Sequence, residues 1–323
     1  MKTIVSLILL FFVASSQPDK KAPSITSDEV KAMVNYLASD ELQGRKTGDE
    51  GIDKAATYIE NQFRSYGVKP YFETYRDEFK IDSINAFNVV GFIEGTDAKL
   101  KDEVIILGAH YDHIGYGSAA KSKTSGGRLT ETDSIANGAN DNAAGTAAVL
   151  AMAKYFATNK NNKRSIIFAL FTAEEMGLLG STHLAERLKS EALNLYTMVN
   201  FEMVGVPLKD KKYQAFVTGY DLSNMATKMN EYLNETNYLG ASEIAIKYQL
   251  FKRSDNYPFY AIFKAPCQSI SSCDLSNFDY YHHADDEPSE LDYEFMASFI
   301  NKVTLAIEAM SNTKTKEIVM YEH

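Results

Sequence analysis

Hydrophobic and polar residues follow two different periods along the chain, and together they predict an α/β protein. Short, uninterrupted apolar runs are typical of strands buried on both faces of a sheet, and they occur at residues 104–110, 165–172 and 196–203. Apolar residues at helical spacing predict helices at residues 28–39, 52–66, 142–158 and 181–190. Because strands and helices alternate, we expect a doubly wound, mostly parallel mixed sheet with helices on both faces.

The outer parts of the chain add further elements to this scheme. We predict strands at residues 71–81, 86–93, 213–218 and 265–270, and helices at residues 221–234 and 289–310. Ser27 is expected to cap the first helix, and Ser289 with Glu290 the last. Residues 111–140 form a long polar segment, which in a compact domain usually carries function or is disordered. We see no internal repeat and no Pro-rich linker, so we expect residues 17–323 to form one domain.

The first sixteen residues have the pattern of a secretory signal peptide. Lys2 provides a positive start, residues 4–13 an apolar core, and residues 14–16 a small-residue exit. The apolar core is shorter than the roughly 20 residues that a membrane span needs. We therefore expect an exported protein, periplasmic or extracellular, without a stable membrane span.

The composition of the chain does not indicate a nucleic-acid partner or a zinc site made of thiolates. The formal net charge of −10 gives no indication of the basic surface expected of a nucleic-acid binder. Cys267 and Cys273 are the only cysteines, and the extended segment between them would hold them about 20 Å apart. A disulfide would therefore require a tight loop. The chain has no Cys-x-x-Cys spacing, so we do not expect a zinc site made of thiolates.

Two adjacent carboxylates, Glu174 and Glu175, follow the apolar run at residues 165–172. In open α/β sheets, ligands bind at the carboxyl ends of the strands. Two acids at that place need a cation, a proton or water to offset the hydration they lose. The alternative is a solvated turn that carries two surface acids.

Two other segments, one at a strand end and one at a helix start, carry polar groups of the same kind. His110 and Asp112 end the run at residues 104–110, and their spacing of two puts both side chains on one side of an extended chain. Asp112 is then placed to orient a metal-bound imidazole. Asp141 stands at the start of the helix at residues 142–158. Each has a simpler alternative, a structural histidine in one case and a helix cap in the other.

Further candidates lie in the C-terminal half. Glu202 interrupts an apolar run, where a buried carboxylate needs a partner. His282 and His283 lie within an acidic stretch at residues 278–290, which taken alone would be a solvated loop. Together the candidates supply histidine and carboxylate ligands at four or five strand ends. Such ligands suit zinc, with cobalt or manganese as possible substitutes, and they suffice for two ions.

The order of these segments resembles the co-catalytic zinc aminopeptidases related to bacterial leucyl aminopeptidase, aminopeptidase Y and glutamate carboxypeptidase II. The resemblance runs from about residue 37 to residue 286 and is carried by LASDELQGRKTGDEG, GAHYDHIG, NGANDNAAG, FTAEEMGLLGS and YHHADDE, in the order of the family. It implies a zinc-exopeptidase fold with two zinc ions and a peptide substrate that has a free N-terminus.

The resemblance also implies roles for individual residues. It makes His110 and Glu202 ligands of the first zinc, and Glu175 and His282 ligands of the second. The remaining positions implied are Asp141 as the bridging carboxylate, Asp112 as the support of His110, and Glu174 as the general base. It further implies that the peptide bond between residues 141 and 142 is cis.

The chain departs from the family pattern at three positions. The family most often has aspartate where Glu202 stands, and the longer side chain puts the occupancy of the first site in question. The usual Ser-Asp-His appears as Ser254, Asp255 and Asn256, and His283 stands where threonine is common. The connection at residues 93–103 is too short to contain an inserted protease-associated domain.

The expected activity is removal of N-terminal residues from peptides. Two metal ions polarise the scissile carbonyl and activate water, and Glu174 takes the proton and passes it to the leaving amine. One alternative is a glutaminyl cyclase, a relative with the same fold that uses one zinc ion and carries pocket tryptophans, of which this chain has none. Another is a non-enzymatic peptide-binding protein on a decayed peptidase fold. The preferred residue, the natural substrate and the oligomeric state are left open.

Overall fold

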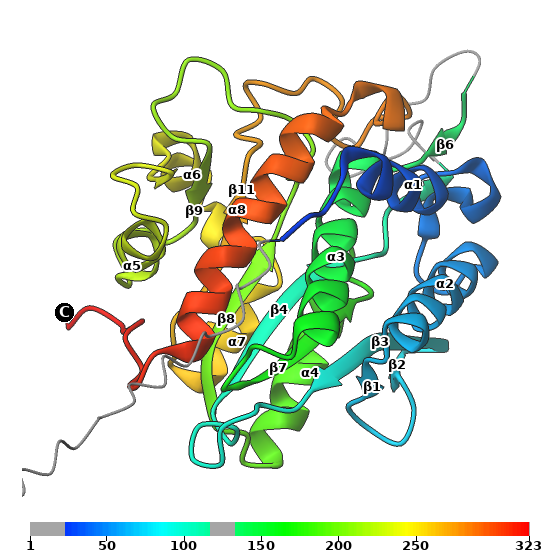
Figure 1. Ribbon diagram of the computed structural model, residues 1–323. Coiled ribbons are helices and arrows are strands. Elements are labelled where there is room, and N and C mark those ends of the chain that lie inside the picture. The colour runs from blue at the N-terminus through cyan, green and yellow to red at the C-terminus, as the bar shows by residue number, and fades with distance from the viewer. Residues whose placement is uncertain (1–22, 117–132, 323) are drawn as a thin grey trace, which may run out of the picture.

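The computed structural model describes residues 23–116 and 133–322, which form a central sheet covered by helices on both faces (Figure 1). The predicted signal peptide and the middle of the polar segment at residues 111–140 lie outside the described residues. Within the described ranges, no helix is long and apolar enough to cross a membrane.

The main sheet has nine strands in the order β1-β3-β7-β4-β8-β11-β9-β10, and β2 pairs with β3. These strands are β1 (Lys69–Pro70), β2 (Arg76–Ile81), β3 (Ile84–Ile93), β4 (Val104–His110), β7 (Ser165–Phe171), β8 (Leu195–Phe201), β9 (Ala215–Val217), β10 (Leu239–Gly240) and β11 (Cys267–Ser271). The central strands β7, β4, β8 and β11 run parallel, whereas β1 to β3 are antiparallel additions at one edge. A separate two-stranded sheet pairs β5 (Gly115–Tyr116) with β6 (Ile135–Ala136). The predicted mixed, mostly parallel sheet is confirmed.

Helices cover the sheet in two layers (Figure 1). The helices are α1 (Ser27–Leu37), α2 (Glu50–Tyr66), α3 (Ala144–Asn159), α4 (Leu179–Ser190), α5 (Met225–Tyr232), α6 (Glu243–Lys247), α7 (Asn256–Phe263) and α8 (Tyr293–Asn312). Short turns complete the fold at η1 (Asp40–Arg45), η2 (Ala139–Ala143), η3 (Leu250–Lys252) and η4 (Pro288–Glu290).

Alternating residues of the central strands feed two separate apolar cores. Ile105 and Leu107 of β4 pack on one face, with α1, α2, α3 and α8. Val104 and Ile106 of the same strand pack on the other face, with α4 and α7. Since side chains of a strand alternate between faces, a strand covered on both sides is apolar throughout. This explains the uninterrupted apolar runs of the sequence.

Several element boundaries differ from the predictions. Thr26, not Ser27, caps α1, because its hydroxyl accepts the backbone N–H of Glu29. Asp292 caps α8, and the predicted caps Ser289 and Glu290 lie in the preceding turn η4. The helix α7 was missed, and the predicted strand at residues 71–81 is shorter, since β2 begins at Arg76.

Candidate metal centre

The parallel strands bring the polar residues at their carboxyl ends together at the same end of the sheet. β4 and β7 run side by side, with His110 opposite Phe171 in the register, so the segment with Glu174 and Glu175 begins next to His110. β8 pairs with the other side of β4 and ends at Phe201, so Glu202 lies just past the strand rather than inside it. The carboxyl ends of three neighbouring strands therefore supply this site.

Asp141 reaches the site from the turn η2, just before α3. The peptide bond between Asp141 and Asn142 is cis, as predicted. The Asn142 side chain fixes this turn to the sheet, because its amide donates to the carbonyl of Phe201 (2.8 Å) and its oxygen accepts the N–H of Met203 (3.1 Å). From the other side, the Asp286 carboxylate accepts the N–H of Asp141 at 3.0 Å.

A first group of potential ligands surrounds Nε2 of His110. Asp141 Oδ1 and Glu202 Oε1 both lie 3.2 Å from this nitrogen. Nδ1 of the same ring is 3.1 Å from the backbone oxygen of Asp112, which leaves Nε2 to face the two carboxylates. Ser254 donates its hydroxyl to Glu202 Oε2 at 2.6 Å and so fixes the other carboxylate oxygen.

A second group lies on the other side of Asp141. His282 Nε2 is 3.2 Å from Asp141 Oδ2 and 3.1 Å from Glu175 Oε1. His113 Nδ1 lies 3.0 Å from the same Glu175 oxygen and 3.9 Å from Asp141 Oδ2. The two oxygens of Asp141 thus face two different sets of ligands. Tyr281 stacks on the His282 ring with centroids 4.0 Å apart.

The ligand atoms fit bound zinc in both spacing and chemistry. Atoms about 2.1 Å from a tetrahedral ion lie roughly 3.4 Å from one another. The nitrogen–oxygen pairs of the two groups are 3.0–3.9 Å apart. Among the described residues, neither ring nitrogen of His113 nor Oε1 of Glu175 has a hydrogen-bond partner. Bound cations would offset the cost of these crowded, half-buried or buried carboxylates.

The pKa values of the site's members show how strongly its carboxylates favour positive charge nearby. Burial alone would lower the pKa of His110, but the Glu202 and Glu174 carboxylates raise it well above its ordinary value. Burial raises the pKa of Asp141, yet hydrogen bonds from His110 and His282 bring it well below the ordinary value. The carboxylates therefore strongly favour positive charge at the positions of both groups.

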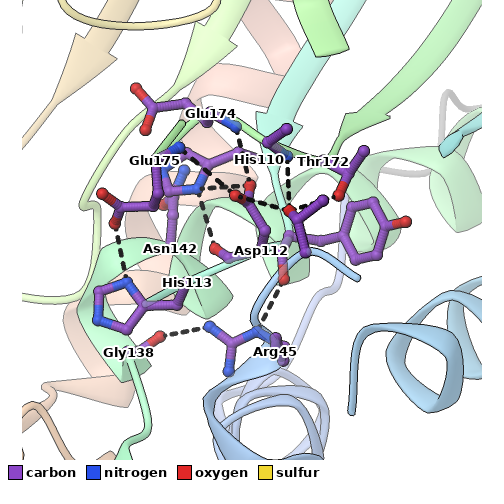
Figure 2. A network of polar contacts seen from close by, with 12 residues as sticks. Arg45, His110, Asp112, His113, Gly138, Asn142, Thr172, Glu174 and Glu175 are labelled. Carbon is purple, nitrogen blue, oxygen red and sulfur yellow. Dashed lines mark hydrogen bonds and ion pairs between the residues drawn. The ribbon is translucent and has the colours of Figure 1, made fainter. Parts of the chain in front are cut away.

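Asp112 holds the segment that carries the two glutamates. Its carboxylate accepts the backbone N–H of Glu174 at 3.2 Å and that of Glu175 at 3.4 Å (Figure 2). The nearest Asp112 carboxylate oxygen is 3.6 Å from His110 Nδ1, farther than the backbone oxygen of the same residue. The predicted support of His110 thus comes chiefly from the Asp112 backbone, and the side chain positions the following loop.

Glu174 lies beside the metal ligands but belongs to neither group. In Figure 2 its carboxylate points away from Asp112, and it lines a cavity together with His110, Glu202 and His282. Its half-buried position raises the pKa of the Glu174 carboxyl well above its ordinary value, and the charge of Glu175 contributes in the same direction. A carboxylate with a raised pKa is better matched to proton transfer near neutral pH.

Three residues of the site were not predicted from the sequence. Arg45 lies fully buried beneath it, and its guanidinium donates to the backbone oxygens of Tyr111 (2.8 Å) and Gly138 (2.9 Å). Thr47 donates to Asp112 at 3.3 Å. Both belong to the segment LASDELQGRKTGDEG, which in the sequence indicates only a resemblance to the zinc aminopeptidases. The third is His113, three residues after His110 in GAHYDHIG.

The departures from the family pattern are accommodated within the fold. Asn256 accepts a hydrogen bond from the Ser269 hydroxyl at 2.7 Å and donates to the backbone oxygen of Phe251 at 3.1 Å. His283 points to its own loop, where its Nδ1 accepts the N–H of Asp285 at 3.0 Å. His282, and not His283, therefore faces the ligand groups.

The sequence comparison assigns the family. The profile of peptidase family M28 matches residues 88–307, more than half of the chain. The chain belongs to peptidase family M28. The matched residues include all seven predicted site residues: His110, Asp112, Asp141, Glu174, Glu175, Glu202 and His282.

Curated relatives of this M28 chain carry the names of a zinc metalloprotease and of a leucine aminopeptidase. A probable zinc metalloprotease of Pyrenophora tritici-repentis is 26% identical over 218 residues, which cover 58% of this chain and 41% of that protein. A leucine aminopeptidase 2 of Arthroderma otae is 30% identical over 159 residues, which cover 48% of this chain and 28% of that protein. The chain thus spans well under half the length of these relatives.

Solved structures confirm the fold and include two different reactions. The zinc aminopeptidase BSAP of Bacillus subtilis matches with a TM-score of 0.68 at 14% identity, covering 93% of this chain and 99% of that one. A glutaminyl cyclase of Bacteroides thetaiotaomicron matches with a TM-score of 0.67 at 16% identity, covering 91% and 100%. At such identities the likeness establishes the fold, and the reaction must be argued from the site.

Proposed function

We propose that this M28 peptidase is an exported zinc-dependent aminopeptidase, which removes N-terminal residues from peptides with two bound metal ions. The observation that carries the proposal is the position of Asp141 between two ligand groups. One of its oxygens lies 3.2 Å from His110 Nε2 and the other 3.2 Å from His282 Nε2. A carboxylate placed in this way serves two ions at once, as in two-metal hydrolases.

The residues of the site divide into ligands, positioning groups and one base. The first zinc would be held by His110, Asp141 and Glu202, and the second by Asp141, Glu175 and His282. When bound, the ions would supply Lewis acidity to the carbonyl oxygen and to the attacking water. Cobalt or manganese ions suit the same ligands.

Glu174 has the position and the chemistry of the general base. Its carboxylate borders the cavity between the two groups without belonging to either, so it can take the proton of the water and pass it to the leaving amine. Asp112 fixes the backbone of Glu174 and Glu175 by two hydrogen bonds, and so directs one glutamate to the ligands and leaves the other free.

A cavity beside the ligand groups can accept the N-terminal residue of the substrate. Apolar side chains form much of its wall: Met203, Phe216, Leu250, Cys273 and Leu275. Among the described residues its polar members include Thr218 and Arg253. An apolar wall favours a substrate with an apolar first side chain, whose free α-amine meets the carboxylates at the metal end of the cavity. The substrate is thus a peptide with a free N-terminus rather than a nucleic acid.

A glutaminyl cyclase is the second candidate, because such an enzyme shares this fold over nearly the whole chain. That reaction needs one ion, whereas here Asp141 presents both oxygens to separate histidines. The absence of tryptophan from the sequence also separates this chain from the pocket expected of those enzymes. Both observations favour hydrolysis.

The experiment that separates the candidates is a substrate panel tested with the zinc-loaded protein. We expect p-nitroaniline release from aminoacyl-p-nitroanilides with a free amine, fastest for apolar residues, and none from N-acetylated counterparts. Formation of pyroglutamyl peptide and ammonia from glutaminyl peptides, without hydrolysis of the panel, would establish the cyclase. Zinc binding with neither reaction would favour a peptide-binding protein.

We also propose that residues 1–16 are a signal peptide and that residues 17–323 form a single peptidase domain. Lys2 followed by the apolar residues 4–13 supports the export. Expression of the full chain, followed by cell fractionation and N-terminal sequencing, should yield a periplasmic or secreted protein that begins near Gln17. A protein retained inside the cell with Met1 intact would contradict it.

A further inference from the structure

We propose that His113 is a direct ligand of the second zinc ion, in addition to Asp141, Glu175 and His282. The inference rests on the proposed two-metal function and adds a residue that the family resemblance does not assign. His113 is 1% exposed, and its Nδ1 lies 3.0 Å from Glu175 Oε1 and 3.9 Å from Asp141 Oδ2. The distance to Glu175 matches the 3.1 Å of His282, whereas the distance to Asp141 is longer than the 3.2 Å of His282.

The hydrogen bonding of His113 is incomplete without a metal ion. Neither of its ring nitrogens has a hydrogen-bond partner among the described residues, and neither has Oε1 of Glu175. A buried polar atom without a partner is costly, and native proteins rarely leave one. Although His113 Nδ1 and Glu175 Oε1 are only 3.0 Å apart, they do not meet the geometry of a hydrogen bond. Two ligands of one ion have no need of that geometry, because the ion lies off the line that joins them.

The surrounding backbone is shaped to hold the imidazole at this place. Gly138 has φ +59°, and a Cβ atom there would lie 2.5 Å from His113 Cγ and 2.6 Å from Cδ2. Only glycine therefore leaves room for the ring. The N–H of His113 donates to the backbone oxygen of Arg45 at 3.2 Å, and the Arg45 guanidinium holds the backbone oxygen of Gly138 at 2.9 Å. Figure 2 shows this arrangement, with the His113 ring between Glu175 and Gly138.

The neighbouring histidine supports a shared ion. The His113 and His282 rings meet edge to face with centroids 5.6 Å apart, and both rings approach Glu175 Oε1. With His113 included, the protein would supply two imidazoles and two carboxylates to the second ion, and a fifth position would take the water, since catalytic zinc can expand to five-coordinate. The two ions together would then be bound by three histidines rather than two.

The test compares zinc binding and ligand type in wild-type protein, His113→Ala, His113→Asn and the control His183→Ala. His183 lies outside the site, beside Asp77, with its side chain 32% exposed. Zinc affinity is measured by competition with a chelator. The number of imidazoles per zinc comes from X-ray absorption at the zinc edge, and circular dichroism confirms the fold. His113→Asn is included because it keeps a polar side chain if the alanine variant does not fold.

Wild-type protein and His183→Ala should bind two zinc ions with three imidazoles between them. Both His113 variants should keep one tight ion, lose one imidazole from the zinc spectrum, and bind the second ion more than about 100-fold more weakly, beyond the 10–100-fold typical of outer-shell partners. Unchanged affinity would overturn the inference. Weaker binding with an unchanged imidazole count would also overturn it, since His113 would then only position Glu175. A wild-type protein that binds no second ion would instead contradict the proposed two-metal function.

Discussion

Replacing Glu174 by alanine or glutamine should lower turnover by about two to four orders of magnitude while leaving the bound zinc in place. The Glu174 side chain belongs to neither ligand group, and Asp112 holds this residue through its backbone N–H, which both variants keep. Glutamine retains the size of the side chain and removes its ability to accept a proton. The pair of variants therefore separates loss of the base from loss of packing.

The magnitude follows from the chemistry assigned to this carboxylate. Proton transfer by a positioned side chain contributes about 10²–10⁴-fold to rate, which corresponds to roughly 2.7–5.4 kcal/mol of activation free energy. Burial raises the pKa of Glu174 well above its ordinary value, which makes it a stronger base than an exposed carboxylate. Glu174→Asp withdraws the carboxylate by about 1.5 Å and should cost on the order of 10²-fold.

The assay measures kcat with an aminoacyl-p-nitroanilide and, on the same samples, zinc content by mass spectrometry. Wild-type zinc content with kcat lowered by two to four orders of magnitude is the expected result for Glu174→Gln. If Glu174→Gln retains near-wild-type turnover, Glu174 is not the base. If it loses zinc, Glu174 is a ligand and the division of roles between the two glutamates is wrong.

Three further predictions concern the ligands and the stability of the fold. Glu202→Gln should weaken zinc binding at the first site only, and zinc titration of the metal-free variant should show one tight step instead of two; two unchanged steps would make Glu202 a structural acid. His282→Ala should lose the second ion, whereas His283→Ala should retain both, as measured by zinc content; the reverse result would contradict the assignment. Burial raises the pKa of Asp77, but hydrogen bonds, with His183 first among the donors, lower it below its ordinary value. The charged Asp77 therefore stabilises the fold above about pH 4. This contribution is lost as the pH falls through the lower pKa of the folded state. Thermal melts at pH 7 and pH 3 should therefore show a smaller loss of stability on acidification for Asp77→Asn than for wild type, and equal losses would refute the argument.

The sheet was predictable because burial on both faces leaves a strong pattern. β4 and β7 match the predicted apolar runs to within one residue. The helix α7 was missed because its sequence NYPFYAIF carries a proline and several aromatic residues instead of a helical period. Proline is compatible with the first turn of a helix, and packing on the sheet decides the rest.

The candidate site was predictable where residue types are costly to bury. Histidines and carboxylates at strand ends need partners, so the sequence indicates His110, Glu175 and Glu202 as candidates. Their pairing was not, because it depends on the register of β4, β7 and β8 and on the path of the turn that carries Asp141. The distances between these residues along the sequence do not indicate which of them lie together in the fold.

Residues that hold others in place left weaker signals. Arg45 works through hydrogen bonds to backbone oxygens, which carry no mark in the sequence. Ser254 is separated from its partner Glu202 by 52 positions, and the contact exists because β8 and the start of α7 meet at the sheet edge. His113 carries no separate signal in the sequence, because it lies in the same motif as His110.

We propose that this member of family M28 hydrolyses peptides from a free N-terminus with two zinc ions. Stepwise addition of zinc to metal-free protein, with binding and hydrolysis of leucyl-p-nitroanilide followed together, tests it most directly. We expect two binding steps, no hydrolysis without metal, and maximal rate only when two equivalents are bound. Saturation of binding at one equivalent, without hydrolysis at any zinc concentration, would contradict it.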